Sequence, residues 1–219
     1  MNNKHLLIAA AALVVAAAAG YVAWDRHQTK TLQDATLTRI DNATQALRTA
    51  LAPSNDPLAQ SQVVAAAVER VEQDLAALRA TSTSRILLLG AGADTYLHTT
   101  RELLKRQAAA LVLDTSVRNG ITAFRNHLAG NRAAADWTTE AVRLKNRLEL
   151  DFREYQRAVD AHTSIADGYA DAHKALAGFV AEGRIPPTTE ITAARDRTTA
   201  AARTLTSEVE TARRMAAPR

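Results

Sequence analysis

Histidine and aspartate side chains recur in one stretch of the chain, and they are groups that hold divalent metals and transfer protons. Asp160-Ala161-His162 is followed eleven residues later by Asp171-Ala172-His173, with Asp167 between the two units. Eleven residues are about three turns of a helix, so both units share a face, but their histidines would stand about 16 Å apart along the axis. One ion cannot bridge that distance. His162 also falls on an apolar stripe, where a core histidine is the ordinary outcome. We therefore treat Asp160, His162, Asp167, Asp171 and His173 as weak metal candidates and expect no metal site and no cofactor.

Two other patterns match catalytic or nucleotide-binding elements only in part. His98 and His127 have no serine or cysteine nucleophile with an orienting carboxylate at motif spacing. The apolar run 86–89 is followed by Gly90-Ala91-Gly92, as at the start of a dinucleotide-binding loop, but Thr95 stands where the third glycine belongs and no alternating strands follow. We expect a helix here, in which the glycines permit close packing or a kink, and we expect no enzyme.

Prolines, glycines and turn-forming side chains divide the chain into helical segments. Residues 52–57 form the first break, after which Asp56 is expected to cap the next helix with Pro57 at its first position. Other breaks are expected at 81–84, at Asn119-Gly120, near Gly130, and at 183–187. The Asn119-Gly120 turn would separate a short helix over 121–128, and Asp136 would cap the helix after it. The last helix is expected to start at Thr188 or Thr189.

Within these segments, apolar residues recur at steps of three and four, which predicts amphipathic helices. The stripe before the first break contains Leu37, Ile40, Thr44, Leu47 and Leu51, and the next contains Val64, Val68, Val71, Leu75 and Leu78.

The longest stripe runs over 137–180 and would extend roughly 66 Å as one helix. A helix of that length needs packing partners. Two interpretations stay open: the stripe forms the core of this chain, or part of it pairs with another chain through a seam of Leu148, Phe152, Tyr155, Val159, Ile165, Tyr169, Leu176 and Phe179.

The N-terminal sequence indicates a membrane location. Residues 6–24, LLIAAAALVVAAAAGYVAW, carry no charge over 19 residues, which is just enough to cross about 30 Å of hydrocarbon. Tyr21 and Trp24 at its end suit the headgroup region. We expect a tail over 1–5, a transmembrane signal anchor over Leu6–Trp24 and a helical domain over 25–219, with no break between the anchor and the first helix of the domain. A signal peptide cleaved after Ala17-Ala18-Ala19 is the alternative.

Two signals beside this run point to opposite orientations in the membrane. Lys4 precedes it, whereas Arg26, Lys30 and Arg39 follow it, which mildly favours a cytoplasmic body under the positive-inside rule. A short tail followed by an Ala/Leu/Val run is, however, the usual form of an export signal. We expect a single-pass inner-membrane protein whose body lies in the periplasm or otherwise outside the cytoplasm.

Composition narrows the classes of partner. The formal charge is +4, but acidic and basic residues alternate along the body, as on solvated helix faces rather than on a one-signed surface for phosphates. We therefore expect no nucleic-acid partner. Aromatic residues make up 4% of the chain, so the core should be thin and rich in alanine. The chain has no cysteine, which excludes disulfides and thiolate metal sites.

The sequence as a whole predicts an all-α, elongated bundle of four or five helices with coiled-coil-like hairpins, carried on one N-terminal transmembrane helix. The expected function is that of a membrane-tethered scaffold or accessory interaction protein of the bacterial cell envelope, with a protein partner or a second copy of the chain and no small-molecule substrate. One alternative is a sensory or ligand-binding helical module. Another is an exported soluble helical protein whose signal peptide is cleaved.

Overall fold

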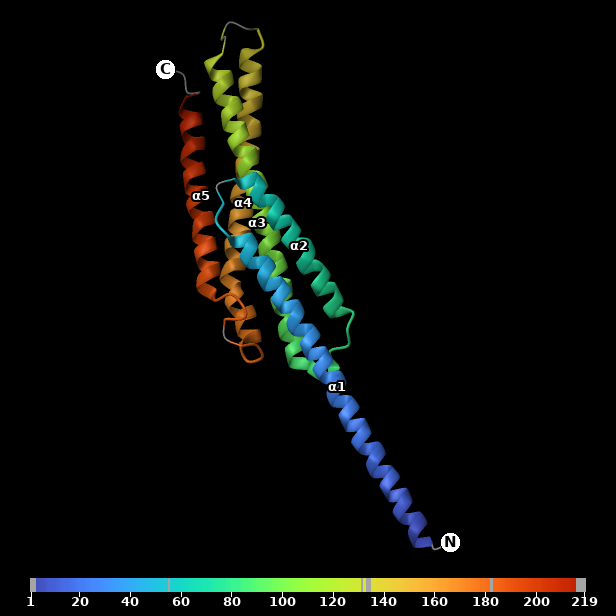
Figure 1. Ribbon diagram of the computed structural model, residues 1–219. Coiled ribbons are helices and arrows are strands. Elements are labelled where there is room, and N and C mark those ends of the chain that lie inside the picture. Colours follow the sequence, from blue (N-terminus) through green and yellow to red (C-terminus); the bar gives the residue numbers. More distant parts are fainter. Residues whose placement is uncertain (1–2, 55, 131, 133–134, 182, 216–219) are drawn as a thin grey trace.

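The fold was obtained as a computed structural model that describes residues 3–54, 56–130, 132, 135–181 and 183–215, with side chains from residue 18 onward. Its elements are the helices α1 (Asn3–Leu51), α2 (Pro57–Arg79), α3 (Leu87–Ala129), α4 (Trp137–Ala177) and α5 (Thr188–Met215), with a single 3-10 turn, η1 (Ser84–Ile86), before α3. No strand occurs in these residues. The expected all-α, elongated bundle is confirmed (Figure 1).

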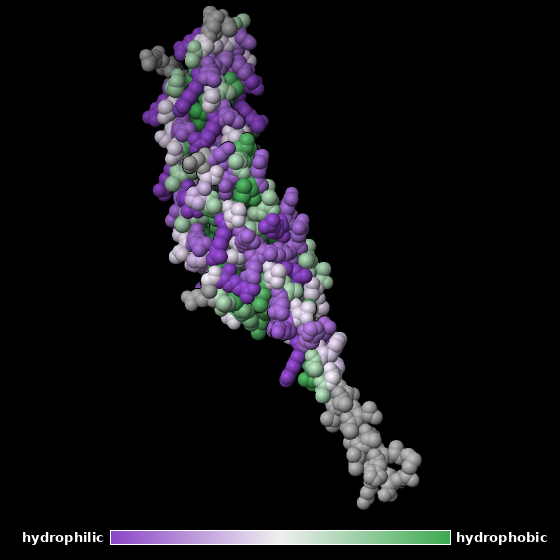
Figure 2. All heavy atoms as spheres, viewed as in Figure 1, coloured by the Kyte–Doolittle hydropathy of each residue, from purple (hydrophilic) through white to green (hydrophobic). Residues whose placement is uncertain are grey.

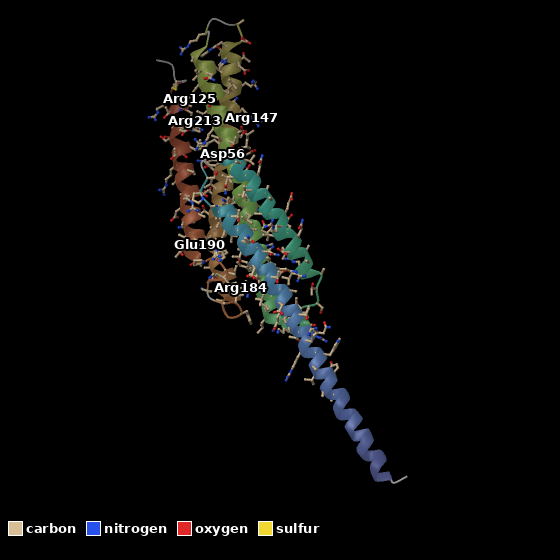
Figure 3. The ribbon with its side chains drawn as sticks, viewed as in Figure 1. Asp56, Arg125, Arg147, Arg184, Glu190 and Arg213 are labelled. Carbon is tan, nitrogen blue, oxygen red and sulfur yellow. The ribbon has the colours of Figure 1, made fainter. Side chains whose placement is uncertain are left out.

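Each helix runs back along the one before it, and α3 and α4 form a hairpin that extends through the whole length of the bundle (Figure 1). The α1–α2 hairpin covers the half of the α3–α4 hairpin from which α1 projects. Helix α5 begins beside that half, where Ile191 and Ala194 are buried, and continues over the other half. The connection between α4 and α5 is tied to α1 by Arg184, whose guanidinium donates to both carboxylate oxygens of Asp41 at 2.6 and 2.5 Å (Figure 3).

Two hydrophobic cores follow from this arrangement. The N-terminal core joins α1, α2, the first half of α3, the end of α4 and the first turns of α5, and contains Leu47, Val71 and Leu104 among its buried side chains. The distal core joins the second half of α3, the first half of α4 and α5, and is built around residues such as Phe124 and Leu205. Only α3 and α4 contribute heavily to both, so their pairing holds the two halves together.

The pairing of α3 with α4 keeps one antiparallel register along the hairpin. The rings of Tyr96 and Tyr169 meet edge to face at 6.2 Å, and further along Ser116 donates to Asp151 at 2.9 Å. The two backbones approach closely at Gly92, where an added Cβ would lie 2.5 Å from the carbonyl oxygen of Ala175. The absence of a side chain at this position lets the two backbones touch.

One predicted break is wrong. The structure has no turn at Asn119-Gly120 and no separate helix over 121–128, because α3 continues unbroken to Ala129. Asn119 faces solvent, and Gly120 lies against α4, where an added Cβ would be 3.3 Å from Cδ1 of Leu148. Packing along α4 therefore overrides the local turn preference of this pair.

The other breaks are confirmed, with small shifts. Asp56 caps α2 by accepting hydrogen bonds from the backbone N–H groups of Leu58 and Ala59 at 2.9 and 3.1 Å (Figure 3). The break after Arg79 is also present, and the glycine-containing run after it is helical, with Gly90 packed on Thr83.

The ends of the later helices match the sequence less closely. Asp136 is the N-cap residue of α4, but its side chain makes no capping hydrogen bond. That helix ends at Ala177 rather than Val180, and Gly178 follows it. The start of α5 at Thr188 agrees with the prediction.

The stripes of the first two helices are confirmed as core. Ile40, Leu47, Val64 and Val71 are fully buried. Thr44, which fills the missing apolar step in α1, is buried and shares a 2.8 Å hydrogen bond with the Tyr96 hydroxyl.

The predicted anchor falls mainly outside the part of the chain whose side chains are described. The expected tail, 1–5, and residues 6–17 of the run Leu6–Trp24 belong to that undescribed part, although the backbone from Asn3 onward is helical and continuous with the bundle. Among the described residues, none of the helices has the length and apolar character needed to cross a membrane.

A pair of glycine substitutions tests the α3–α4 contact. We expect Gly92→Ala to destabilise the fold by about 1–3 kcal/mol, because its methyl group would overlap the Ala175 carbonyl. Gly168→Ala on α4 is the matched control: nothing lies within 4 Å of its added Cβ, so it should stabilise the fold by about 0.5–1 kcal/mol through helix propensity. Urea unfolding of both variants measures the difference, and equal effects would contradict the close approach.

Candidate functional site

The five metal candidates do not converge. They all lie on α4, and Asp160, Asp167 and Asp171 are exposed while His162 is buried. Asp167 instead pairs with Arg195 of α5 at 2.5 Å, and the ring of His173 stacks at a tilt on Tyr169 with 6.3 Å between centroids. Nowhere in the described part of the chain do three or more potential ligands gather around one point.

His162 is the unusual member of this group. It is 1% exposed, and neither of its ring nitrogens has a hydrogen-bond partner among the described residues. Burial lowers its pKa from 6.5 to about 4, because the low-dielectric surroundings disfavour the charged imidazolium. The side chain is therefore a neutral core histidine at pH 7.

The two remaining histidines considered as catalytic groups also have structural partners. The Nε2 atom of His127 lies 2.8 Å from the carbonyl oxygen of Trp137, and the two rings stack with 5.4 Å between centroids, which closes the distal end of the α3–α4 hairpin. The Nδ1 atom of His98 lies 3.4 Å from Arg101 Nη2 one turn further along α3.

The proposed seam on α4 points mainly into this chain. The buried members are Leu148, Phe152, Tyr155, Val159, Tyr169 and Leu176. Ile165 is partly buried against the N-terminal core, and only Phe179 is exposed, at 44%. The long stripe thus forms the core of the monomer, and in this conformation it leaves only Phe179 for contact with another molecule.

A hollow lies at the step between the two cores, where the α1–α2 hairpin ends and α5 passes beside it. Its volume is about 430 Å³. Leu51, Pro53 and Pro57 of the hairpin connection form one wall, and Tyr155 of α4 and Ala194 of α5 belong to others. We call this hollow the step pocket; Asp56 marks its level along the bundle (Figure 3).

Polar side chains around the step pocket cap the C-terminal end of α1. The side-chain amides of Gln60 and Gln107 donate to the Ala50 carbonyl at 2.5 and 3.2 Å, and the Arg197 guanidinium donates to the Leu51 carbonyl at 2.8 Å. The last carbonyls of a helix have no partner inside it. Helices α2, α3 and α5 therefore supply these partners from three directions.

An ion pair between a buried carboxylate and a half-exposed guanidinium also lines the pocket. The carboxylate of Asp114 is 8% exposed and accepts two hydrogen bonds from Arg118 at 2.8 and 3.3 Å, and Arg118 also reaches Glu208 of α5 at 3.5 Å. These hydrogen bonds raise the pKa of Arg118. Burial, together with the Asp114 charge, raises the pKa of Tyr155 to about 12, so the phenol stays protonated.

The step pocket has the composition of a small-molecule binding surface. The step pocket combines apolar walls with a guanidinium, a carboxylate and the buried Gln107 Oε1, which has no hydrogen-bond partner among the described residues. Such a surface can hold a small amphipathic molecule. The pocket was not predicted from the sequence: its residues come from all five α-helices, and the only local signal was the proline-rich break at 52–57.

Comparison with protein-family models, curated proteins and solved structures finds no match to this chain.

The buried His162 predicts a pH dependence of stability. Its pKa is lower in the folded chain than in the unfolded chain, so below pH 6.5 the unfolded state binds a proton that the folded state does not. Its contribution to stability is therefore intact above pH 6.5 and is lost as the pH falls towards 4. The loss at pH 5 should be about 2 kcal/mol, measured by urea unfolding.

His162→Leu is the matched variant, because it keeps an apolar side chain at the site and cannot titrate. Other groups titrate equally in both proteins, so the difference in unfolding free energy between wild type and variant isolates His162. We expect the unfolding free energy of the variant to rise relative to that of the wild type as the pH is lowered from 7 to 5. A difference that does not change with pH would show that His162 is not buried in the neutral form.

Proposed function

We propose that this chain is a membrane-tethered helical scaffold or accessory interaction protein of the bacterial cell envelope, without catalytic activity. In this proposal, residues 6–24 form the anchor, and the bundle lies in the periplasm or otherwise outside the cytoplasm. The chain would be a single-pass protein of the inner membrane, and its partner would be another protein or a second copy.

The observation that carries this proposal is the continuity of α1. The helix runs from Asn3 to Leu51 without interruption, and Thr36 is the first of its described residues to be buried. It therefore projects from one end of the bundle (Figure 1), and Tyr21 and Trp24 on the projecting part are 64% and 52% exposed. An apolar helix without packing partners gains little in water, whereas a bilayer can surround it.

The proposed anchor predicts how the protein distributes between cell fractions. The wild-type chain should sediment with membranes and resist alkaline carbonate. Replacing Leu13 and Val14 by lysine should release it, because each lysine at the centre of a membrane helix costs about 2.5–3.5 kcal/mol. The matched control places the same two lysines at Val142 and Leu150, which are exposed on α4, and should leave the distribution unchanged.

Two further readings complete this test. An intact mass that begins at Gly20, with the chain in the soluble fraction, would contradict the tether and support a cleaved signal peptide. A cysteine at the exposed Ser54 would be unique in the chain and should react with an impermeant thiol reagent in cells with a permeabilised outer membrane. Labelling only after lysis would place the bundle in the cytoplasm.

The step pocket favours a second candidate function, a sensory or ligand-binding module. Its volume of about 430 Å³ falls within the range of small-molecule sites. The guanidinium of Arg118 and the carboxylate of Asp114 lie together on its wall, and they would orient a small amphipathic molecule that carries both polar and apolar groups.

Thermal unfolding with a panel of small amphipathic compounds tests this candidate. A binder at one hundred times its Kd should raise the stability by about 2.7 kcal/mol. The control is Ala201→Trp, which places a large ring in the pocket from an exposed position on α5 and should abolish the stabilisation. A shift of equal size in this variant would place the binding elsewhere.

A further inference from the structure

The connection between α2 and α3 lies against α1 near the point where α1 leaves the bundle. The Arg85 guanidinium stands 5.1 Å from the centre of the Trp24 ring and pairs with Asp25 at 3.3 Å. Trp24 in turn lies 6.2 Å from Tyr21, centroid to centroid, on the projecting part of the helix. This end of the bundle is therefore fixed next to the last residues of the predicted anchor.

Large apolar side chains are exposed at the same end. Leu87 and Leu88, in the first turn of α3, are 66% and 70% exposed, and Phe179, just beyond α4, is 44% exposed. All three line one shallow hollow beside α1, and hydrophobic side chains gather at the end of the body from which α1 projects (Figure 2). We call Leu87, Leu88 and Phe179 the base patch.

The length of the apolar run places the base patch at a defined height. From Leu6 to Trp24 the helix rises roughly 28 Å at 1.5 Å per residue, which matches a hydrocarbon thickness of about 30 Å. Trp24 would then lie at the membrane interface. Arg85 contacts the Trp24 ring and is separated from Leu87 by a single residue, so the base patch would lie at about the same level.

We propose that the base patch inserts into the interfacial region of the phospholipid bilayer that holds α1, with Arg85 facing lipid phosphates. This inference rests on the proposed tether. Apolar and aromatic side chains with a neighbouring guanidinium suit this region, where one end of a group is apolar and the other hydrated. We assign the bilayer as the occupant because α1, in the proposed tether, already holds the patch next to it. A contact within a tethered molecule forms at high effective concentration, so three side chains are enough to bind the membrane interface.

The absence of cysteine from the sequence makes a direct test possible. Leu88→Cys in the full chain is labelled with an environment-sensitive nitrobenzoxadiazole dye and reconstituted into phosphatidylcholine–phosphatidylglycerol vesicles that contain lipids spin-labelled near the headgroup. The matched control is Val142→Cys, which is 53% exposed on α4 in the distal half. We expect blue-shifted emission and severalfold stronger quenching at position 88 than at position 142.

Each outcome decides between the two proposals. If the chain floats with the vesicles but both dyes are quenched equally weakly, the tether stands and the base-patch inference is wrong. If the dye at position 88 is blue-shifted without quenching by lipid, protein covers the patch, which also overturns the inference. If the chain does not float with the vesicles at all, the tether fails and the inference fails with it.

A charge substitution gives a second, independent reading. The double variant Leu87→Asp and Leu88→Asp changes only exposed side chains, so the chain should remain folded and tethered. A dye attached at Phe179→Cys, in the same hollow but on the other connection, should lose most of its quenching by lipid in this double variant. Unchanged quenching would show that Leu87 and Leu88 do not hold the base at the bilayer.

Discussion

The close antiparallel packing of α3 on α4 is the contact on which the rest of the fold depends. Both cores are built on these two helices, and α1, α2 and α5 each cover only part of their length. The packing is close because small residues meet where bulky ones would hold the backbones apart, most clearly at Gly92 against Ala175. An alanine-rich chain has little apolar area to bury per residue, so it gains stability from long and close contacts rather than from large side chains.

Much of this fold was predictable because its signals are local and periodic. The stripes at Ile40–Leu51 and Val64–Leu78 recur at helical spacing, and prolines mark the breaks at 52–57 and 183–187. What failed was the Asn119-Gly120 turn, where a locally favourable turn competes with packing on Leu148. A turn preference is a property of a few residues, whereas the continuity of α3 depends on α4, which begins beyond the next connection.

The polar groups inside the bundle could not have been predicted from the sequence. The spacing of His162 marked it as a core position, but not as a core position without a hydrogen-bond partner. No sequence pattern distinguishes Asp114 from the other charged residues of the body, yet it is buried beside Arg118, where the α1–α2 hairpin ends and α5 passes nearby. The end of one hairpin against three other helices creates both the polar caps and the step pocket. The position of the end of the α1–α2 hairpin depends on tertiary packing, so no local sequence pattern predicts these polar caps or the pocket.

The same geometry connects the projecting helix to the body. No break in α1 separates the projecting part from the residues that pack in the N-terminal core, so any surface that holds residues before Tyr21 also fixes the direction of the bundle. Two connections lie at that end, one tied to α1 through Arg85 and Asp25 and the other through Arg184 and Asp41. A flexible linker would let a body rotate freely above a membrane, whereas a continuous helix with two side ties holds it in one orientation. If the tether proposed above holds, the same rigidity would keep the distal end of the α3–α4 hairpin at a fixed distance from the bilayer, where a partner at a defined height could meet it.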